Sequence, residues 1–246
     1  MLQSISHLYD DKIGALDGDV GHVEDLYFDD RSWAVRYLVT DTGSWLSGRK
    51  VLISPHAFRG LDRVGKRMVV QLTKKQIEDC PPVEAHKPVS RQYEERYFLH
   101  YGFPFYWQGD GLWGLSGFPI VNLTTQDQSD PLPETGNLTT PYQPNPLPVA
   151  GSVPATVDDP HLRSTQAVNG YQIMATDGTI GHICDFIMDD KSWAIQQLVV
   201  KTGGWLSGTK VLIDTSNVER ISYEESLVYI RATREAVRQS PQLPVE

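Results

Sequence analysis

Short apolar runs, separated by turns rich in glycine and aspartate, make up most of the first 80 residues. The Asp17-Gly18 pair stands between two such runs and supplies the positive φ angles of a tight hairpin. In the following run the apolar positions change parity twice, which indicates a β-bulge near residues 22–25. Further strands are predicted at residues 33–40 and 50–53, and a short helix begins after the capping residue Thr73. Short strands closed by a small helix predict an all-β fold, a small β-barrel.

This pattern is written twice along the chain. Residues 15–53 and 175–213 align without a gap at an offset of 160 positions, and 23 of the 39 aligned positions are identical. The same register relates residues 1–81 to residues 161–241. Two copies do not form a solenoid, which needs three or more units, so we expect each copy to close its own small core. Domains of about 80 residues are marginally stable alone, and we therefore expect the copies to pack as a pseudo-twofold pair.

Residues 82–160 join the two copies and differ from both in composition. Residues 90–101 predict a helix with Tyr93, Tyr97 and Tyr101 on one stripe, because these tyrosines are four positions apart. Residues 122–159 are rich in proline, threonine, glutamine and asparagine, and we expect them to be extended or disordered. The predicted organisation is therefore a barrel at 1–81, an acidic, proline-rich linker at 82–160 and a second barrel at 161–241.

Charge and hydropathy narrow the range of partners and locations. The net charge of −9 divides into −1 for residues 1–80, −6 for residues 81–160 and −2 for residues 161–246. Neither copy has the excess of lysine and arginine that binding to a phosphate backbone requires, so we expect no nucleic-acid partner. No apolar run approaches the roughly 20 residues of a membrane helix, and the first residues lack the features of a signal peptide. We therefore expect a cytoplasmic protein without a transmembrane segment, and the sequence remains compatible with peripheral membrane association.

Histidine and aspartate recur at equivalent positions of the two copies, which makes a metal site the first chemical candidate. The full set is His22, Asp25, Asp29, Asp30, His182, Asp185, Asp189 and Asp190. Residues three apart on a regular strand point to opposite faces, and adjacent aspartates are common in turns. A structural role in the bulge and the turn is therefore favoured over a metal site, and no metal or cofactor is expected.

A phosphate-binding loop and a catalytic centre are also disfavoured. Residues 43–50 resemble a phosphate loop, but no serine or threonine follows Lys50 and the next residues predict a strand instead of a helix. Cys80 and Cys184 lie at non-equivalent positions and are expected to be free thiols in a reducing compartment. No serine or cysteine has an evident base partner, and a barrel this small is filled by its own side chains. We expect a protein that is not an enzyme.

Two sets of apolar and aromatic residues are candidates for contacts with a partner. Trp45 and Leu46 follow a glycine turn, and Trp205 and Leu206 repeat them in the second copy. These side chains either close one end of a barrel or form a contact surface, and the tyrosine stripe offers the same choice. The predicted partner contacts are Trp45, Leu46, Trp205, Leu206, Tyr93, Tyr97 and Tyr101.

The copies differ mainly in charge or polarity. Arg36-Tyr37 corresponds to Gln196-Gln197, and Asp41 corresponds to Lys201. We interpret these differences as changes on outward faces, while interior positions are kept. The two barrels are therefore expected to present different surfaces.

The spacing of the repeated motif resembles that of the PRC-barrel family, which takes its name from the cytoplasmic domain of the photosynthetic reaction-centre H subunit. The matching residues in the first copy are Gly18, Gly21, His22, Asp25 and Asp29, followed by Arg36-Tyr-Leu-Val39 and Val51-Leu-Ile-Ser-Pro55. The second copy matches from Gly178 to Asp189 and departs from the pattern at Gln196-Gln197 and Asp214-Thr215. The resemblance covers both copies and not the linker, and it implies a six-stranded barrel that serves as a protein-contact module.

We therefore expect a non-enzymatic protein-interaction or assembly module that acts alone or as a homo-oligomer. If the source is phototrophic, association with photosynthetic or electron-transport complexes is favoured. A second relative that the resemblance brings in, a ribosome maturation factor, implies a ribosome or RNA maturation factor as one alternative. The other alternative is a metal-binding stress-response protein, which would lose its metal on His22→Ala plus His182→Ala.

Overall fold

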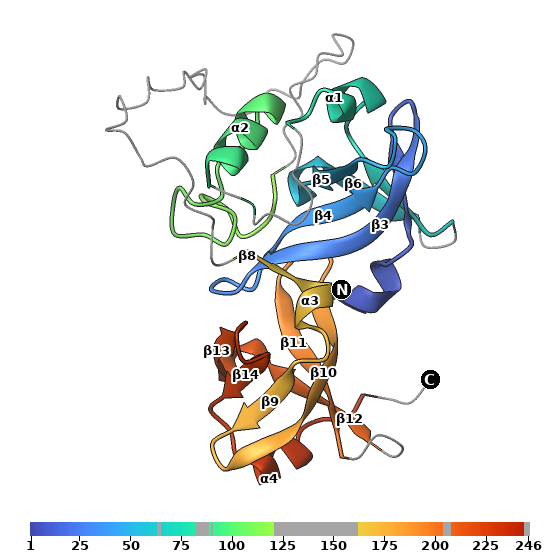
Figure 1. Cartoon of the computed structure of the whole chain (residues 1–246). Coiled ribbons are helices and arrows are strands. Elements are labelled where there is room, and N and C mark those ends of the chain that lie inside the picture. Colours follow the sequence, from blue (N-terminus) through green and yellow to red (C-terminus); the bar gives the residue numbers. More distant parts are fainter. Residues whose placement is uncertain (63–64, 82–88, 90, 121–161, 204–207, 244–246) are drawn as a thin grey trace.

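The computed structural model describes residues 1–62, 65–81, 89, 91–120, 162–203 and 208–243. These residues form two curled β-sheets, each built mainly from one copy of the repeat. In Figure 1 the first sheet (blue to teal) lies above the second (yellow to red), and helix α2 (Arg91–Tyr101) lies on the outer side of the first. The β-rich fold class and the duplication predicted from the sequence are confirmed.

The first sheet has the spatial order β5-β4-β3-β2-β7-β6. Its strands are β2 (Lys12–Ala15), β3 (Gly18–Asp29), β4 (Val35–Asp41), β5 (Lys50–Ile53), β6 (Phe58–Asp62) and β7 (Arg67–Val70). Neighbouring strands are antiparallel except β2 and β7, which are parallel. This parallel pair joins the beginning of the copy to its end and curls the sheet.

The second sheet repeats this topology in the order β12-β11-β10-β9-β14-β13. Its strands are β9 (Gln172–Ala175), β10 (Gly178–Asp189), β11 (Ile195–Thr202), β12 (Thr209–Asp214), β13 (Val218–Ser222) and β14 (Leu227–Ile230). Again the one parallel pair on this path joins the first of these strands to the last in chain order, here β9 to β14. The six strands that the family resemblance implied are present in each copy.

Short helices connect and close the strands. They are η1 (Ile5–Leu8), η2 (Pro55–Ala57), α1 (Lys74–Glu78), α3 (Thr165–Val168), η3 (Thr215–Asn217) and α4 (Arg234–Arg238). The predicted capping box begins α1, because Gln76 N donates to Thr73 Oγ1 and Thr73 N donates to Gln76 Oε1. Thr233 caps α4 by accepting from Ala236 N, without the reciprocal bond, because alanine has no side-chain acceptor.

The predicted bulge lies in the long strand of each copy. The register of β3 against β4 shifts between Val23 and Asp25, and that of β10 against β11 shifts between Ile183 and Asp185. Beside the first bulge the two strands approach so closely that a Cβ at Gly21 would lie 1.9 Å from the carbonyl oxygen of Asp41. Only glycine fits there, which explains why both copies have one at this position.

Each sheet also contains a seventh strand that comes from the other copy. Strand β1 (Leu2–Ser4) pairs with β10, and β8 (Leu162–Ser164) pairs with β3. A further antiparallel bridge joins Ala34 to Ala194, two equivalent positions, as expected of a pseudo-twofold pair. The expectation that each copy closes its own core is wrong, because the opening strand of each copy extends the sheet of the other.

The hydrophobic core continues from one copy into the other. Phe28 of β3 lies against Phe186 of β10, with ring centroids 6.0 Å apart, and both rings are buried. Trp193 of the second copy packs edge-on against Phe58 of the first at 5.2 Å. The molecule therefore contains two barrels around one shared core, and the barrels should not separate as independent domains.

The predicted linker contributes structure of its own. The helix expected at residues 90–101 is α2, Arg91–Tyr101, and residues 102–120 follow it as turns across the first barrel. Trp113 in these turns is buried and donates from Nε1 to the Ser192 carbonyl of the second copy at 2.7 Å. The stretch predicted to be extended or disordered, residues 122–159, lies outside the described residues.

Candidate functional site

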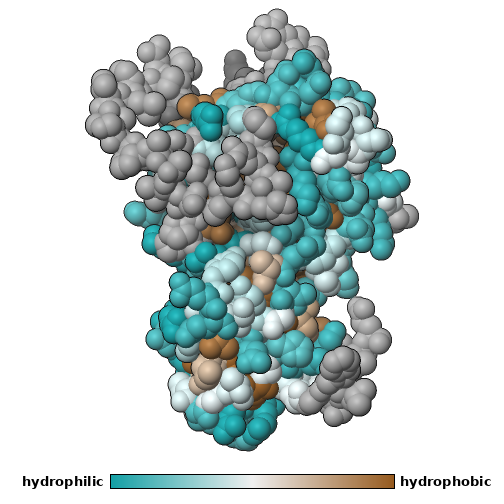
Figure 2. Space-filling view, viewed as in Figure 1, coloured by the Kyte–Doolittle hydropathy of each residue, from teal (hydrophilic) through white to brown (hydrophobic). Residues whose placement is uncertain are grey.

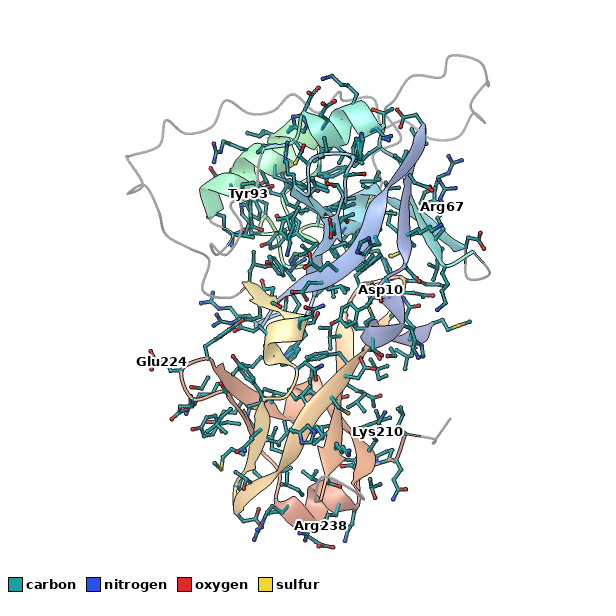
Figure 3. The ribbon with its side chains drawn as sticks, turned by 45° about the vertical axis from the view of Figure 1, so that its right-hand side comes forward. Asp10, Arg67, Tyr93, Lys210, Glu224 and Arg238 are labelled. Atoms are coloured by element: carbon teal, nitrogen blue, oxygen red, sulfur yellow. The ribbon has the colours of Figure 1, made fainter. Side chains whose placement is uncertain are left out.

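The largest difference between the two barrels lies on the outer face of β4 and β5, where α2 covers the first barrel (Figure 3). The Tyr97 ring is fully buried and meets the Tyr37 ring edge-on at 5.3 Å. Its hydroxyl donates to the Leu52 carbonyl at 3.1 Å and accepts from Ser54 N at 2.8 Å. Strand β5 lies at the edge of the sheet, so no neighbouring strand bonds the Leu52 carbonyl and the Ser54 amide. The Tyr97 hydroxyl satisfies both groups.

The other two tyrosines of the stripe flank this contact. The Tyr93 hydroxyl donates to the Pro81 carbonyl at 3.1 Å, and the Tyr101 hydroxyl donates to the Gln76 carbonyl at 3.4 Å. Tyr93 and Tyr97 are 7% and 0% exposed, so they cannot form a surface for a partner while α2 is docked. The prediction of a partner contact at these two residues is corrected: they bind the chain's own barrel. Tyr101 is half-buried in the same contact.

A buried carboxylate joins α2 to the barrel on the other side of Tyr97. Glu94 is fully buried, and its Oε1 accepts from the hydroxyls of Tyr37 and Tyr106, both at 2.8 Å. Its Oε2 lies 3.0 Å from Arg91 Nη1. Burial, followed by the charge of Glu94, raises the pKa of Tyr37 well above its usual value, so its hydroxyl stays a donor.

Arg36 of β4 is enclosed by the turns that follow α2. Its guanidinium lies 3.8 Å from the Tyr106 ring centroid and 4.8 Å from that of Trp113, and Nη1 donates to the Leu112 carbonyl at 2.7 Å. The side chain is buried, and this burial lowers the pKa of the guanidinium. Sequence reasoning placed Arg36-Tyr37 on an outward face. The face does point away from the barrel core, but α2 and the following turns cover it.

His56 occupies the same cluster and stays neutral. It is fully buried, and its ring stacks on Phe103 at 5.5 Å and meets Trp113 edge-on at 5.0 Å. Its Nδ1 lies 3.0 Å from the Ile120 carbonyl, which only a protonated Nδ1 can bond. Burial is the main cause that lowers its pKa to about 4, and the charge of Arg36 lowers it further. The buried cluster therefore holds the charged Arg36 and disfavours protonation of His56 beside it.

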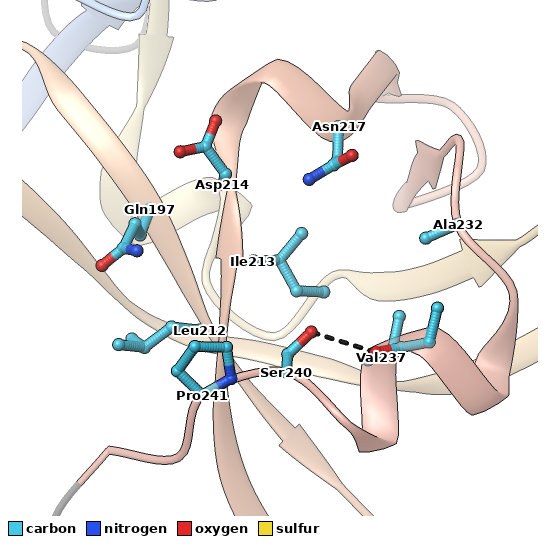
Figure 4. Close-up of a pocket in the computed structure, with 10 residues that line it drawn as sticks. Gln197, Leu212, Ile213, Asp214, Asn217, Ala232, Val237, Ser240 and Pro241 are labelled. Carbon is cyan, nitrogen blue, oxygen red and sulfur yellow. Dashed lines mark hydrogen bonds between the residues drawn. The ribbon is translucent and has the colours of Figure 1, made fainter.

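Among the described residues no helix covers the equivalent face of the second barrel, although residues 241–243 pair with the edge of β12. Gln196 and Gln197 replace Arg36 and Tyr37, and Gln196 is exposed. A cavity of about 330 Å³ lies beside them (Figure 4). Its lining residues are Gln197, Leu212, Ile213, Asp214, Asn217, Ala232, Ala236, Val237, Ser240 and Pro241. The sequence analysis did not predict this cavity. The replacement of Arg36-Tyr37 by Gln196-Gln197 was the one difference that could have indicated it.

The Trp45 loop connects β4 to β5 and packs against the hydrophobic core of the first barrel. Trp45 and Leu46 are half-buried, and Lys74 Nζ lies 4.4 Å from the Trp45 ring centroid. Arg49 anchors the end of the loop by donating to the carbonyls of Glu78 and Cys80 at 3.1 and 2.5 Å. A partner contact at Trp45 and Leu46 stays a prediction, and the corresponding Trp205 and Leu206 lie outside the described residues.

Apolar side chains are also exposed on the outer side of the segment that covers the first barrel. Leu99 is 62% exposed, Phe118 is 56% exposed and Leu115 is 94% exposed. Figure 2 shows hydrophobic residues in small patches on an otherwise largely hydrophilic face. Exposed apolar residues on an ordered segment are common at protein contacts.

The aspartates considered for metal binding hold the exchanged strands and the turns. Asp25 accepts hydrogen bonds from Ser164 Oγ, Thr165 Oγ1 and Gln166 N of the other copy. Asp185 binds Ser4 and Ser6 equivalently. Burial raises the pKa of Asp25, and the hydrogen bond from Ser164 is the largest of those that oppose the shift. Asp29 instead accepts from the turn amides of Arg31 and Ser32.

Other chemical candidates have no matching geometry in the part of the chain that the structure describes. No group of three or more histidine, cysteine, aspartate or glutamate side chains there is placed to hold a metal ion. Lys50 begins strand β5, so the helix that a phosphate loop requires is missing after it. Both cysteines are free, and burial raises the pKa of both thiols. No helix within the described ranges is long and apolar enough to cross a bilayer.

Comparison with known proteins identifies the repeat. The family model described as "PRC-barrel domain" matches residues 9–77 and 165–237. These two segments include the curled six-stranded part of each copy and leave out the segment with α2. A search of curated proteins finds no match.

Proposed function

Because the chain belongs to the PRC-barrel family through both of its repeats, we propose that it is a non-enzymatic protein that binds other proteins and assists their assembly. The proposal places this activity in the cytoplasm, with no nucleic acid and no cofactor involved. Its more specific form is association with photosynthetic or electron-transport complexes, in keeping with the reaction-centre subunit that gives the family its name. The chain would act there as a peripheral component.

One observation carries this proposal. The first barrel already binds a peptide segment, residues 91–120 of its own chain, through its outer strand face. The contact has the composition of a protein interface, with buried tyrosine, tryptophan and arginine at its centre. A barrel of this family can therefore bind an aromatic peptide segment on its outer face, and the same kind of contact can be made to another protein.

We place a second contact on the Trp45 loop. Trp45 and Leu46 are half-buried on a loop whose base Arg49 fixes, so binding would cost little conformational entropy. Trp205 and Leu206 repeat the two side chains in the second copy. A contact of this kind in each copy would let one chain bind two partners or two sites of one partner.

The two alternatives remain predictions with their own tests. A ribosome or RNA maturation factor would bind RNA with an affinity that falls steeply as salt rises. A metal-binding stress-response protein would be purified with stoichiometric metal that His22→Ala plus His182→Ala removes. Asp25 and Asp185 are committed to hydrogen bonds between the copies, which favours protein binding over a metal site.

An affinity purification from native lysate tests the proposal. The bait is the full chain, compared with a Trp45→Ala plus Trp205→Ala variant and with Leu16→Ala, which removes an exposed leucine elsewhere. We expect the double variant to lower recovery of a specific partner by about tenfold or more, the effect of losing an aromatic hot spot. Leu16→Ala should leave recovery unchanged.

Two negative results have different meanings. Equal recovery of every partner with the wild type and the double variant would contradict the placement of the contact on the loops. Recovery of no protein above that of an unrelated bait would contradict the proposed function itself. Circular dichroism of each variant checks that the fold is retained.

A further inference from the structure

The cavity on the second barrel lies where α2 docks on the first. Six of its lining residues are equivalent, at the offset of 160, to residues that the α2 tyrosines contact. They are Gln197, Leu212, Asp214, Ala236, Ser240 and Pro241, which correspond to Tyr37, Leu52, Ser54, Gln76, Cys80 and Pro81. We call these six the second groove. The duplication has therefore copied the tyrosine-binding groove, and the described residues leave it open.

The backbone of the second groove has the same hydrogen-bonding groups to offer. Leu212 N donates outward from the edge strand β12 to the Pro241 carbonyl at 2.9 Å. In a strand the N–H and C=O of one residue point to the same side, so the Leu212 carbonyl also faces outward. Proline has no N–H, and Pro241 cannot return a bond to that carbonyl. The Asp214 amide, two residues on, faces the same edge, as Ser54 does in the first barrel.

We propose that the second groove binds a helix of a partner protein through a tyrosine whose hydroxyl bridges the Leu212 carbonyl and the Asp214 amide. This contact is the one that Tyr97 makes to Leu52 and Ser54. A second aromatic residue four positions later would lie over Ala236, as Tyr101 lies over Gln76. This spacing puts both side chains on one face of the helix.

The side chains that differ between the grooves define the partner further. Asp214 is exposed and replaces the neutral Ser54, which favours a lysine or arginine next to the central tyrosine. Gln197 replaces Tyr37 and offers an amide, which a glutamate at the position of Glu94 can accept from, as it accepts from Tyr37. The Pro241 carbonyl already accepts from Leu212 N, so a residue at the position of Tyr93 has no acceptor to gain.

The occupant is another protein, and the inference rests on the proposed function in that respect. The chain's own α2 is committed to the first barrel, where Tyr93 and Tyr97 are buried. Trp45 does not line the second groove, so the two contacts can fail separately. A tyrosine helix from a second copy is excluded as the occupant if the chain remains monomeric.

The test uses the full chain and a synthetic helical peptide of about 12 residues, the length of α2, labelled with a fluorophore. The peptide carries tyrosines at positions i and i+4 and a lysine beside the first. We expect saturable binding that weakens by about tenfold or more when the first tyrosine is changed to phenylalanine, because the two backbone groups lose their partner. Exchange of the lysine for glutamate should also weaken binding.

Variants of the chain show whether the peptide binds in the second groove. Ala236→Trp fills the second groove from an exposed position of α4 and should abolish binding. Arg238→Trp puts the same ring on the same helix at a position that does not line the groove, and it should leave binding unchanged. Sedimentation velocity of the chain alone is run in parallel.

Three results would overturn the proposal. They are no binding at millimolar peptide, binding that Ala236→Trp does not change, and self-association of the chain that Ala236→Trp removes, which would make a second copy the occupant. Partner recovery that depends on Trp45 and Trp205 would leave the proposed function intact in each of these cases. If the peptide does not bind and no partner is recovered through Trp45 and Trp205, the proposed function itself is contradicted.

Discussion

The outer faces of the two barrels are built on equivalent strands, but the first face is buried and the second is exposed in part. On the first, Arg36 and Tyr37 are buried under α2 and the turns that follow it. On the second, Gln196 is exposed and Gln197 borders a cavity of about 330 Å³. The skeleton of β4 and β11 is shared, including the bulge of the neighbouring strand. The comparison indicates that the residues that differ between the copies are those whose contacts differ: aromatic and charged side chains lie under α2, and polar ones lie where no described helix docks.

The largest expected effect comes from removing the central tyrosine of the covered face. Tyr97→Ala deletes a fully buried ring and leaves the Leu52 carbonyl and Ser54 amide without their partner. We expect the free energy of unfolding to fall by about 4 kcal/mol, the usual cost of truncating a buried aromatic residue. Tyr97→Phe keeps the ring and should cost about 1 kcal/mol. Urea denaturation measures both, and equal costs for the two variants would contradict the role assigned to the ring.

The next effect depends on pH. His56 has a folded pKa of about 4, and its ordinary value is 6.5. Between these values the unfolded chain binds more protons at this histidine than the folded chain does, so stability falls as the pH drops from about 6.5 to about 4. The loss should reach about 3 kcal/mol, since one pKa unit corresponds to about 1.4 kcal/mol.

His56→Asn isolates this contribution, because the asparagine amide nitrogen replaces Nδ1 as the donor to the Ile120 carbonyl and does not titrate. The wild type should lose about 3 kcal/mol more than the variant across that pH range. Carboxylates contribute equally to both proteins and cancel in the difference. The corresponding residue of the second copy, Ser216, is exposed, and Ser216→Ala should not change the pH dependence. Parallel pH profiles for wild type and His56→Asn would contradict burial of a neutral histidine.

The smallest of the three effects compares equivalent positions directly. Arg36→Ala removes two ring contacts and the hydrogen bond to the Leu112 carbonyl, and we expect it to cost about 2 kcal/mol. Gln196→Ala changes an exposed side chain on the same skeleton and should stay within about 0.5 kcal/mol. Thermal unfolding of the two single variants measures the contrast. Similar losses in both would mean that the second face is covered as well.

Much of the fold followed from the sequence because it depends on local pattern. The parity slip near Asp25 predicted the bulge, and Thr73 with Gln76 predicted the start of α1. The exchange of β1 and β8 could not be predicted in this way. A strand of three residues has too little alternation to show which sheet it joins, and Asp25 can bond a serine of either copy equally well.

The candidate site was predicted only in part. The stripe of Tyr93, Tyr97 and Tyr101 correctly marked one face of a helix, but an amphipathic stripe does not show whether it binds its own chain or a partner. The strand at Arg36-Tyr37 has buried residues on both faces. The sequence indicated that Arg36-Tyr37 lie on an outward face but did not show what covers it. The second groove depends on aligning the copies in space, where Pro241 and Leu212 meet.

The backbone amides of Ser54 and Asp214 test the central claim most directly, because they occupy equivalent positions in the two grooves. Two-dimensional amide NMR of the labelled full chain, with and without the tyrosine peptide, reports on both at once. The account predicts that the Asp214 resonance moves on binding while Ser54, which Tyr97 already holds, stays in place. Movement of Ser54 with a stationary Asp214 would show that the peptide displaces α2, and would contradict the account.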